Sequence, residues 1–391
     1  MTACPCCFQE QNDTYRRWQC DTPSCQKPDE VAQAWLGPKA TVGGSVDWVR
    51  DPAVKAAAPE RTGCPTCGRS AGPACPYCHF LFPPSWLGST TVTVAMAGAR
   101  NTGKSVYVGV LIRFLTDLVG RHGSSFSWAH PLSARNYRET YEKALFAVTD
   151  ALGEPVEPTI MGATPRASTE SYQRFPLIMN LGTLARQRTH LILRDVAGED
   201  LEKFAGGTPE DANLTFFASA DLVVYLFDPL TVPYVAGALE GLIPRQMQQG
   251  VADPAQVLGT VLSLVQAGRP RLAVVMSKFD AVQQLRRVPD TTLGRIMIPP
   301  GSAMVRSPAL TGSYDEQDAQ LLHEEIRGLL HEVEADQLVR LAAHYRHRFI
   351  GLSSLGDFPL GERLSPYGIS PYRVLDPLLW ILAEKRLIPT V

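Results

Sequence analysis

The sequence predicts a three-layer α/β domain built on a mostly parallel sheet, preceded by a small zinc-binding domain. All nine cysteines lie between Cys4 and Cys78, and none follows in the rest of the 391-residue chain. Beyond them, buried strand-like segments lead into loops and helical stretches, as in a parallel α/β sheet. We therefore expect residues 1–85 to form a cysteine-rich head with a connector, and residues 88–391 an α/β body.

The composition is that of an ordinary globular protein. Apolar residues make up 45% and charged residues 19% of the chain, and its net charge of -2 gives no chain-wide footprint for nucleic acid or an anionic membrane. Arg16, Arg17 and Trp18 could contact nucleic acid locally, or form an ordinary surface turn. No apolar run approaches the roughly 18 residues of a spanning helix, and the N-terminal residues have neither the basic start nor the apolar stretch expected of a signal peptide. We expect a cytoplasmic protein with no membrane partner.

Two CPxC knuckles stand close together in the head, Cys64 with Cys67 and Cys75 with Cys78. Such a gap lets a turn point two thiolates at one ion, and four thiolates fill the tetrahedral shell that zinc prefers. We assign these four to one structural zinc ion, although the two sets could interleave. Disulfides and buried free thiols are alternatives that the odd cysteine count and the repeated spacing disfavour. Upstream, Cys4, Cys7, Cys20 and Cys25 could form a second set of four thiolates, with Cys6 left unassigned.

Between these cysteines, Gln26–Gly63 is rich in Ala, Gly and Pro and shows no sustained hydrophobic period. We interpret it as a loose connector with short strands around Trp35 and Trp48.

A phosphate-binding loop follows the head. Thr91–Ala97 (TVTVAMA) has the β-branched and small residues of a buried strand, and GARNTGKS follows it directly before a helical stretch. Glycines let backbone N–H groups wrap a phosphate at the helix N-terminus. We expect Lys104 to reach the β- and γ-phosphate oxygens and Ser105 to bind magnesium. The expected nucleotide contacts are Gly98, Ala99, Arg100, Asn101, Thr102, Gly103, Lys104 and Ser105.

A second box, DVAGED, follows the strand-like segment His190–Arg194. Asp195 at a strand end can hold magnesium through water. The backbone N–H of Gly198 can approach the γ-phosphate, as in a DxxG switch.

The third box is SKFD, after the strand-like segment Arg271–Met276. Asp280 would accept two hydrogen bonds from N1 and N2 of guanine, while Lys278 would lie along the base and brace the phosphate loop beside Ser277. Adenine lacks those donors, so each lost charged hydrogen bond would disfavour ATP by about 1.5–3 kcal/mol. This box favours guanine.

Three boxes in this order, each at the end of a predicted strand, resemble the Ras-like P-loop GTPases of the translation-factor-related (TRAFAC) class. The resemblance spans about Gly88–Val391. It implies GTP and magnesium as ligands and GTP hydrolysis as the activity. In the final loop, Phe349–Gly356, the residues Ser353, Ser354 and Leu355 resemble the SAK-type box whose backbone touches the guanine O6.

A long insertion separates the first two boxes. We expect a helix at Ala134–Thr149, then a polar loop holding the first switch, then a strand at Phe175–Leu181. Family members close a switch threonine over magnesium and the γ-phosphate. The candidates here are Thr164 and Thr169, of which we favour Thr169.

The catalytic residues that the resemblance implies are Lys104, Asn101, Thr169 and Glu199. Glu199 stands where the family commonly has a water-orienting glutamine, and it could orient water or simply start the next helix. Asn101 stands where potassium-dependent members bind a monovalent cation that stabilises the transition state. Arg100 is the other candidate for a charge supplied within the chain.

Further extensions follow at Leu230–Arg269 and Ala281–Arg346, the latter with an amphipathic helix at Glu316–Val333. Together with the head, LFDP at Leu226–Pro229 and a closing helix containing LDPLLWIL, this layout resembles the bacterial double-GTPase type 2 domain. That resemblance implies a second GTPase, an activating protein or an adaptor as partner in a counter-invader (antiphage) system, with a homodimer as another arrangement.

We therefore expect a guanine-nucleotide switch that binds GTP with magnesium and hydrolyses it slowly, with dependence on a partner or on potassium. One alternative is a P-loop ATPase in which SKFD is a chance match. Another is a nonhydrolysing, nucleotide-bound scaffold whose zinc head binds protein or nucleic acid.

Overall fold

A seven-stranded sheet of order β13-β12-β11-β7-β10-β9-β8 forms the centre of the body. Five neighbouring strands pair in parallel, whereas β9 pairs antiparallel with both β10 and the edge strand β8. The loops after β7, β10, β12 and β13 therefore meet at the same edge, as parallel strands require. The strands are β7 (Thr90–Ala97), β8 (Ser127–Trp128), β9 (Leu177–Leu184), β10 (Gln187–Asp195), β11 (Leu222–Phe227), β12 (Arg271–Met276) and β13 (His347–Gly351). The computed structural model describes residues 1–12, 14–50, 58–59, 61–146, 175–196, 198, 201, 212–244, 252–265, 270–288, 292–297, 299, 301–306, 308, 310–358, 364–365 and 367–391.

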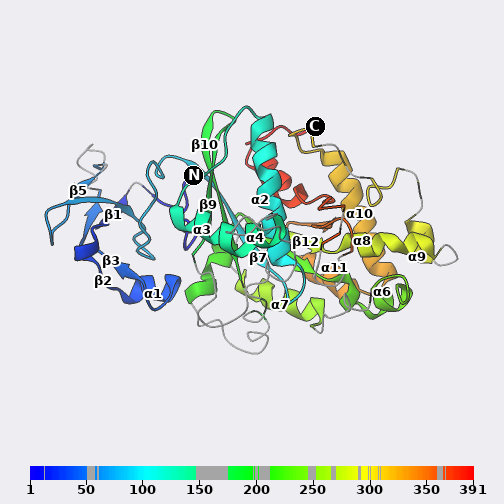
Figure 1. Ribbon diagram of the computed structural model, residues 1–391. Coiled ribbons are helices and arrows are strands. Elements are labelled where there is room, and N and C mark those ends of the chain that lie inside the picture. Colours follow the sequence, from blue (N-terminus) through cyan, green and yellow to red (C-terminus); the bar gives the residue numbers. More distant parts are fainter. Residues whose placement is uncertain are drawn as a thin grey trace, which may run out of the picture.

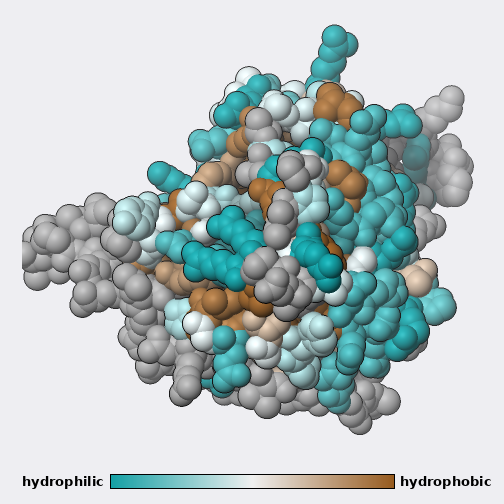
Figure 2. Space-filling view, turned by 90° about the vertical axis from the view of Figure 1, so that its right-hand side faces the viewer, coloured by the Kyte–Doolittle hydropathy of each residue, from teal (hydrophilic) through white to brown (hydrophobic). Residues whose placement is uncertain are grey.

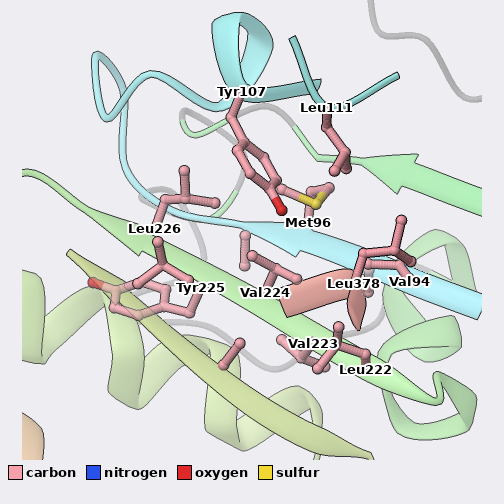
Figure 3. Packing of buried hydrophobic residues seen from close by; sticks show 14 of the residues in the cluster. Val94, Met96, Tyr107, Leu111, Leu222, Val223, Val224, Tyr225, Leu226 and Leu378 are labelled. Atoms are coloured by element: carbon pink, nitrogen blue, oxygen red, sulfur yellow. The ribbon is translucent and has the colours of Figure 1, made fainter. Parts of the chain in front are cut away.

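Helices cover both faces of this sheet, which confirms the predicted three-layer α/β architecture. On one face Tyr107 of α2 reaches toward Met96 of β7, with Leu378 of α12 nearby (Figure 3). On the other face the hydroxyl of Tyr225 donates to the carbonyl oxygen of Pro254 at 2.6 Å. The helices of the body are α2 (Lys104–Arg121), α3 (Pro131–Tyr137), the π-helical turn η2 (Arg138–Glu142), α4 (Lys143–Phe146), η4 (Ala212–Ser219), η5 (Pro229–Thr231), α6 (Pro233–Ala238), α7 (Pro254–Leu264), α8 (Phe279–Val282), η7 (Gln283–Arg287), α9 (Thr292–Ile296), α10 (Glu316–Glu332), α11 (Asp336–Ala342) and α12 (Asp376–Glu384).

The predicted helix at Ala134–Thr149 is divided by a π-helical turn, and its last residues lie outside the described ones. It packs so closely on α2 that a Cβ on Gly109 would lie 2.6 Å from Leu145 and 3.3 Å from the Cβ of Tyr141. The hydroxyl of Tyr137 also donates to the carbonyl oxygen of Gly109 at 3.1 Å. These three side chains follow one another at intervals of four, and the wider turn keeps them on the same face against α2.

The head contains a four-stranded antiparallel sheet of order β4-β1-β6-β5 and lies to one side of the body (Figure 1). Trp48 lies in a strand as predicted, but the prediction of a strand around Trp35 is wrong. The side chain of Asp29 accepts a hydrogen bond from the Ala32 N–H at 2.7 Å and starts a helix there. The elements of the head are β1 (Tyr15–Cys20), η1 (Pro23–Cys25), β2 (Lys27–Pro28), α1 (Glu30–Leu36), β3 (Thr41–Val42), β4 (Ser45–Val49), β5 (Thr62–Gly63) and β6 (Ser70–Ala74).

The first residues of the chain are bound to the start of β7. The hydroxyl of Thr2 donates to the Ser89 carbonyl oxygen at 2.5 Å, and the Ala3 N–H donates to the Thr91 hydroxyl at 2.8 Å. The indole N–H of Trp86 donates to the Ala3 carbonyl oxygen at 2.9 Å. The N-terminus of the head is therefore held against the strand that leads into the phosphate-binding loop.

His190 of β10 is buried in this joint, and the stability of the fold should depend on its charge. Its Nδ1 lies 3.0 Å from the Ser89 hydroxyl, and its ring lies 4.6 Å from the Trp86 ring. Burial, assisted by the positive charge of Arg188, lowers the pKa of His190 to about 4. An unfolded histidine binds a proton near pH 6.5, so unfolding takes up a proton between about pH 6.5 and 4.

We expect the contribution of His190 to be fully present above pH 6.5 and to fall by on the order of 3 kcal/mol as the pH drops to about 4. Chemical denaturation of the wild type and of His190→Gln across this range measures the difference. Glutamine binds no proton, so the two stability curves should converge on acidification. Curves that stay parallel would show that the histidine does not titrate as described.

The surface on the side of α6, α9 and α10 is mostly hydrophilic among the described residues (Figure 2). α10 contributes to this by burying Leu322, Ile326 and Leu329 and exposing its polar side, as its predicted amphipathic pattern requires. Within the described part of the chain, no helix combines the length and the apolar character needed to cross a membrane.

Candidate nucleotide-binding site and metal centres

The loop after β7 has the backbone of a phosphate cradle. Gly98, Asn101 and Gly103 adopt φ angles of 145°, 62° and 84°. A Cβ on Gly98 would lie 2.3 Å from the carbonyl oxygen of Leu226, so the close approach of β11 requires glycine at this position. The glycine spacing read from the sequence therefore corresponds to real backbone constraints.

The charge of Lys104 lies inside this loop. The side chain is only 8% exposed, and its Nζ donates to the carbonyl oxygens of Gly98 at 2.6 Å and Ala99 at 2.9 Å. The Thr102 hydroxyl donates to the same Ala99 oxygen at 2.9 Å. α2 begins at Lys104, so the N-terminus of the helix and an ammonium group lie at one anion-binding position, with Ser105 following in the first turn.

Asp195 ends β10 beside this cradle and is half-buried, with its Oδ1 shielded from solvent. In the described part of the chain its Oδ1 has no hydrogen-bond partner. Burial raises the pKa of Asp195 to about 6, while the charge of Lys104 and a hydrogen bond with Tyr141 lower it. A buried carboxylate oxygen without a partner, next to a phosphate cradle, fits a hard divalent cation. Asp195 and Ser105 would hold magnesium, which neutralises phosphate charge when bound.

The glycine of the second box lies directly on the phosphate loop. A Cβ on Gly198 would lie 2.5 Å from both the carbonyl carbon of Ala99 and the nitrogen of Arg100. Sequence spacing therefore identified a glycine that the structure requires. The predicted switch and water-orienting residues, Thr169 and Glu199, lie outside the described residues, as does Thr164.

The third box and the final loop meet at the end of β12 and β13. Asp280 is 9% exposed and hydrogen-bonded to Ser353, which is 1% exposed. Burial raises the pKa of Asp280, and that hydrogen bond opposes the rise. The backbone N–H of Phe279 also donates to the Leu352 carbonyl oxygen at 3.1 Å. These two loops, with Ser354 and Leu355 half-buried beside them, form one polar corner of the kind that could hold a base.

Lys278, which was predicted to lie along the base and brace the phosphate loop, pairs with Asp228. It has left-handed backbone angles, with φ 49° and ψ 38°, and its Nζ lies 2.5 Å from Oδ2 of Asp228. Ser277 joins the same strand end, because its hydroxyl donates to the Phe227 carbonyl oxygen at 2.8 Å. Asp228 belongs to the LFDP segment, which the sequence singled out without a role.

The cradle and the base corner lie on one edge of the sheet, separated by β11. β11 pairs in parallel with β7 on one side and with β12 on the other. Strands lie about 4.8 Å apart, so β7 and β12 are roughly 10 Å apart. One nucleotide can bridge two loops at this separation.

The eight predicted metal ligands form two groups of four thiols, but the predicted pairing is wrong. In each group the sulfur atoms lie within 4.8 Å of one another. The two CPxC knuckles stand at opposite ends of β6, whose five residues hold them roughly 17 Å apart, so they cannot share an ion. Each group instead combines one CPxC knuckle with two upstream cysteines, which is the interleaved arrangement that the sequence left open. The inner group is Cys4, Cys7, Cys75 and Cys78, and the outer group is Cys20, Cys25, Cys64 and Cys67.

Both groups fit zinc, as four thiolates without further ligands form a closed tetrahedral site. Their nearest sulfur pairs are 3.4 to 3.6 Å apart, close to the roughly 3.8 Å of a tetrahedron with Zn–S bonds of about 2.3 Å. Backbone N–H groups of Thr66 and Tyr77 each donate to the first sulfur of their knuckle at 3.4 Å. Cys6 belongs to neither group, and Nδ1 of His79, which follows Cys78, lies 2.9 Å from Oδ1 of Asp29.

The inner group belongs to the hydrophobic core of the body. Its four cysteines are buried, and they share a cluster with the strands of the large sheet. In the outer group Cys67 is exposed, while Cys20, Cys25 and Cys64 form a separate small cluster.

Arg194 connects the inner group to the end of β10, where Asp195 lies. Its guanidinium donates to the Cys6 carbonyl oxygen at 2.5 Å and lies 4.2 Å from the centre of the Phe216 ring. Arg194 is buried and directly precedes Asp195 in β10. The backbone between Cys4 and Cys7 is thus bonded to the strand end that carries Asp195.

Comparison with known proteins gives one relative that matches along the whole chain. The chain is 36% identical over 390 residues to "Putative ESX-1 scaffolding and assembly protein SaeC" of Mycolicibacterium smegmatis, covering 97% of this chain and 98% of that protein. No protein-family model matches.

Among solved structures, the S. cerevisiae Ski7 GTPase-like domain bound to GTP has 13% identity and a TM-score of 0.35, covering 76% of this chain and 50% of that chain. Sup35 complexed with GMPPNP has 14% identity and a TM-score of 0.25, covering 74% and 45%. The chain thus spans about half the length of these two structures. Because the mycobacterial relative is 36% identical and matches nearly the whole of both chains, this chain belongs to the SaeC family.

Proposed function

We propose that this protein is a guanine-nucleotide switch that binds GTP with magnesium. The observation that carries the proposal is the position of two unlike binding loops on one sheet edge. Lys104 and the helix N-terminus offer positive charge at one loop, and Asp280 offers a buried carboxylate at the other. A triphosphate joined to a base with two adjacent N–H donors satisfies both ends. Ser105 and Asp195 would hold the accompanying cation.

Nucleotide titration of the full-length protein tests this proposal. With mant-labelled GTP, GDP and ATP in magnesium, the wild type should prefer GTP over ATP by at least about 100-fold, because ATP forfeits two charged hydrogen bonds. Lys104→Ala should weaken GTP binding by roughly 10- to 100-fold. Lys385→Ala is a matched control, since its Nζ donates to the Thr91 carbonyl oxygen, earlier in β7, at 2.9 Å. Equal affinity for ATP would favour the ATPase alternative, and unchanged binding by Lys104→Ala would refute the phosphate role.

We further propose slow hydrolysis that depends on a partner or on potassium. Asn101 is exposed at the tip of the phosphate loop, with a φ of 62°, where a monovalent cation could join it. Single-turnover assays of the same preparation, in potassium and in sodium, measure the rate of hydrolysis and its dependence on potassium. A nonhydrolysing scaffold is the second candidate, because the mycobacterial relative is named as a scaffolding and assembly protein. No turnover in either salt, with intact GTP binding, would favour it.

The name of that relative also supports protein partners and a role in assembly. We therefore place the switch in the scaffolding or assembly of a protein complex rather than in the counter-invader system that the double-GTPase resemblance implies. The zinc head is the candidate region for recruiting such a partner. A second GTPase, an activating protein, an adaptor or a second copy of the chain could fill this role, and pull-down with GTP-loaded and GDP-loaded protein would separate them.

A further inference from the structure

Asp228 is a buried carboxylate at the junction of the two binding loops. Its side chain is 1% exposed, and it follows directly after β11, the strand between β7 and β12. Its Oδ2 lies 2.5 Å from Nζ of Lys278, and its Oδ1 accepts the Leu230 N–H at 2.9 Å. One carboxylate oxygen therefore caps the turn that follows β11, and the other pairs with the ammonium group of Lys278 in the third box.

The same strand end contacts the cradle and the third box. Gly98 lies so close to the Leu226 carbonyl oxygen that it has no room for a side chain. The next residue, Phe227, accepts hydrogen bonds from both the backbone N–H of Ser277 at 3.0 Å and its hydroxyl at 2.8 Å. Asp228 then holds the ammonium of Lys278. Three successive residues of β11 and its end thus fix the spacing between the phosphate loop and the base corner.

We infer that Asp228 is a positioning residue for the nucleotide site, acting through Lys278. A lysine side chain has a flexible four-carbon stem and rotatable donors, so its direction must be set by a partner. Lys278 has left-handed backbone angles and stands two residues before Asp280. The ion pair between the Lys278 ammonium and the buried Asp228 carboxylate holds this strained turn in the arrangement that presents the Asp280 carboxylate to the base. This inference rests on the proposed guanine-nucleotide function.

The chain offers a closely matched control. Asp253 also precedes a proline, and its Oδ1 also accepts the N–H of the residue two positions later at 2.9 Å, starting α7. Asp228→Asn and Asp253→Asn therefore remove a charge from equivalent caps while keeping the cap oxygen. Only Asp228 has the additional bond to Lys278.

The test is a double-mutant cycle on mant-GTP and mant-GDP affinity with full-length protein. Asp228→Asn should weaken both nucleotides about tenfold, mainly through faster dissociation, and Asp253→Asn should leave both unchanged. Lys278→Met should weaken binding by a similar factor, and adding Asp228→Asn to it should cause no further loss. A purely structural role for Asp228 would instead give losses that multiply.

The outcomes distinguish failure of the proposed function from failure of the positioning role. A wild type that binds neither nucleotide overturns the proposed function itself. A wild type that binds, with Asp228→Asn binding equally well or losing affinity again in the Lys278→Met background, overturns the positioning role and leaves the function standing. Asp228→Ser, which also keeps a cap oxygen, gives the same cycle if the asparagine variant fails to fold.

Discussion

Serine at Cys75 is expected to destabilise the whole nucleotide-binding body, whereas serine at Cys64 is expected to leave it folded. Both residues are the first cysteine of a CPxC knuckle, and each sulfur accepts a backbone N–H at 3.4 Å. They differ in where their groups lie, because the inner group shares the core of the large sheet and the outer group forms its own small cluster. Structural zinc contributes about 10–16 kcal/mol, comparable to the entire stability of a domain.

The measurement combines metal content with thermal unfolding. Each variant should lose one zinc ion per chain. Cys75→Ser should lower the unfolding midpoint of the body by on the order of 10 °C or more and weaken GTP binding, since Arg194 bonds the Cys6 carbonyl oxygen, between two ligands of the inner group, to the strand of Asp195. Cys64→Ser should change the body little. Equal falls in both variants would mean that the two zinc groups are energetically alike, contrary to their different burial.

Much of the body could be predicted because its signals are local. The buried strand at Arg271–Met276 was predicted with the bounds that the structure has, and α10 begins at the predicted Glu316. A run of β-branched residues or a helical hydrophobic period within each segment indicates its secondary structure. The π-helical turn at Arg138–Glu142 has no such signal, because it arises from contact with Gly109 on another helix. The zinc pairing failed for the same reason, since it depends on the length of β6.

The same distinction applies to the candidate site: residues with a local sequence signal were identified, and residues without one were missed. The cradle and Asp280 were identified from fixed spacings next to strands, which reflect backbone geometry that only certain residues allow. Asp228 and Tyr141 were missed as site residues because they reach the site from elements outside the three boxes, Asp228 from the end of β11 and Tyr141 from η2. The available signal for Asp228 was its position at the end of the strand between two boxes. No spacing in the sequence points to Tyr141.

Asp280→Asn is expected to exchange the preferred base from guanine to xanthine. Asp280 is buried and hydrogen-bonded to Ser353, so its carboxylate meets few competitors for the two N–H donors of guanine. The asparagine amide retains one acceptor for the base N1–H but presents a donor where guanine also has a donor. Xanthine carries an oxygen at that position and matches the amide. Losing a charged hydrogen bond and creating a donor clash should cost at least about 3 kcal/mol, or more than 100-fold.

The ratio of GTP to XTP affinity, measured for the wild type and for Asp280→Asn with ATP as the control ligand, tests most directly whether one nucleotide spans the two loops. We predict that the wild type prefers GTP, that the variant prefers XTP, and that ATP stays weak for both. A variant whose ratio equals that of the wild type would contradict the account, because the SKFD carboxylate would then not contact the base.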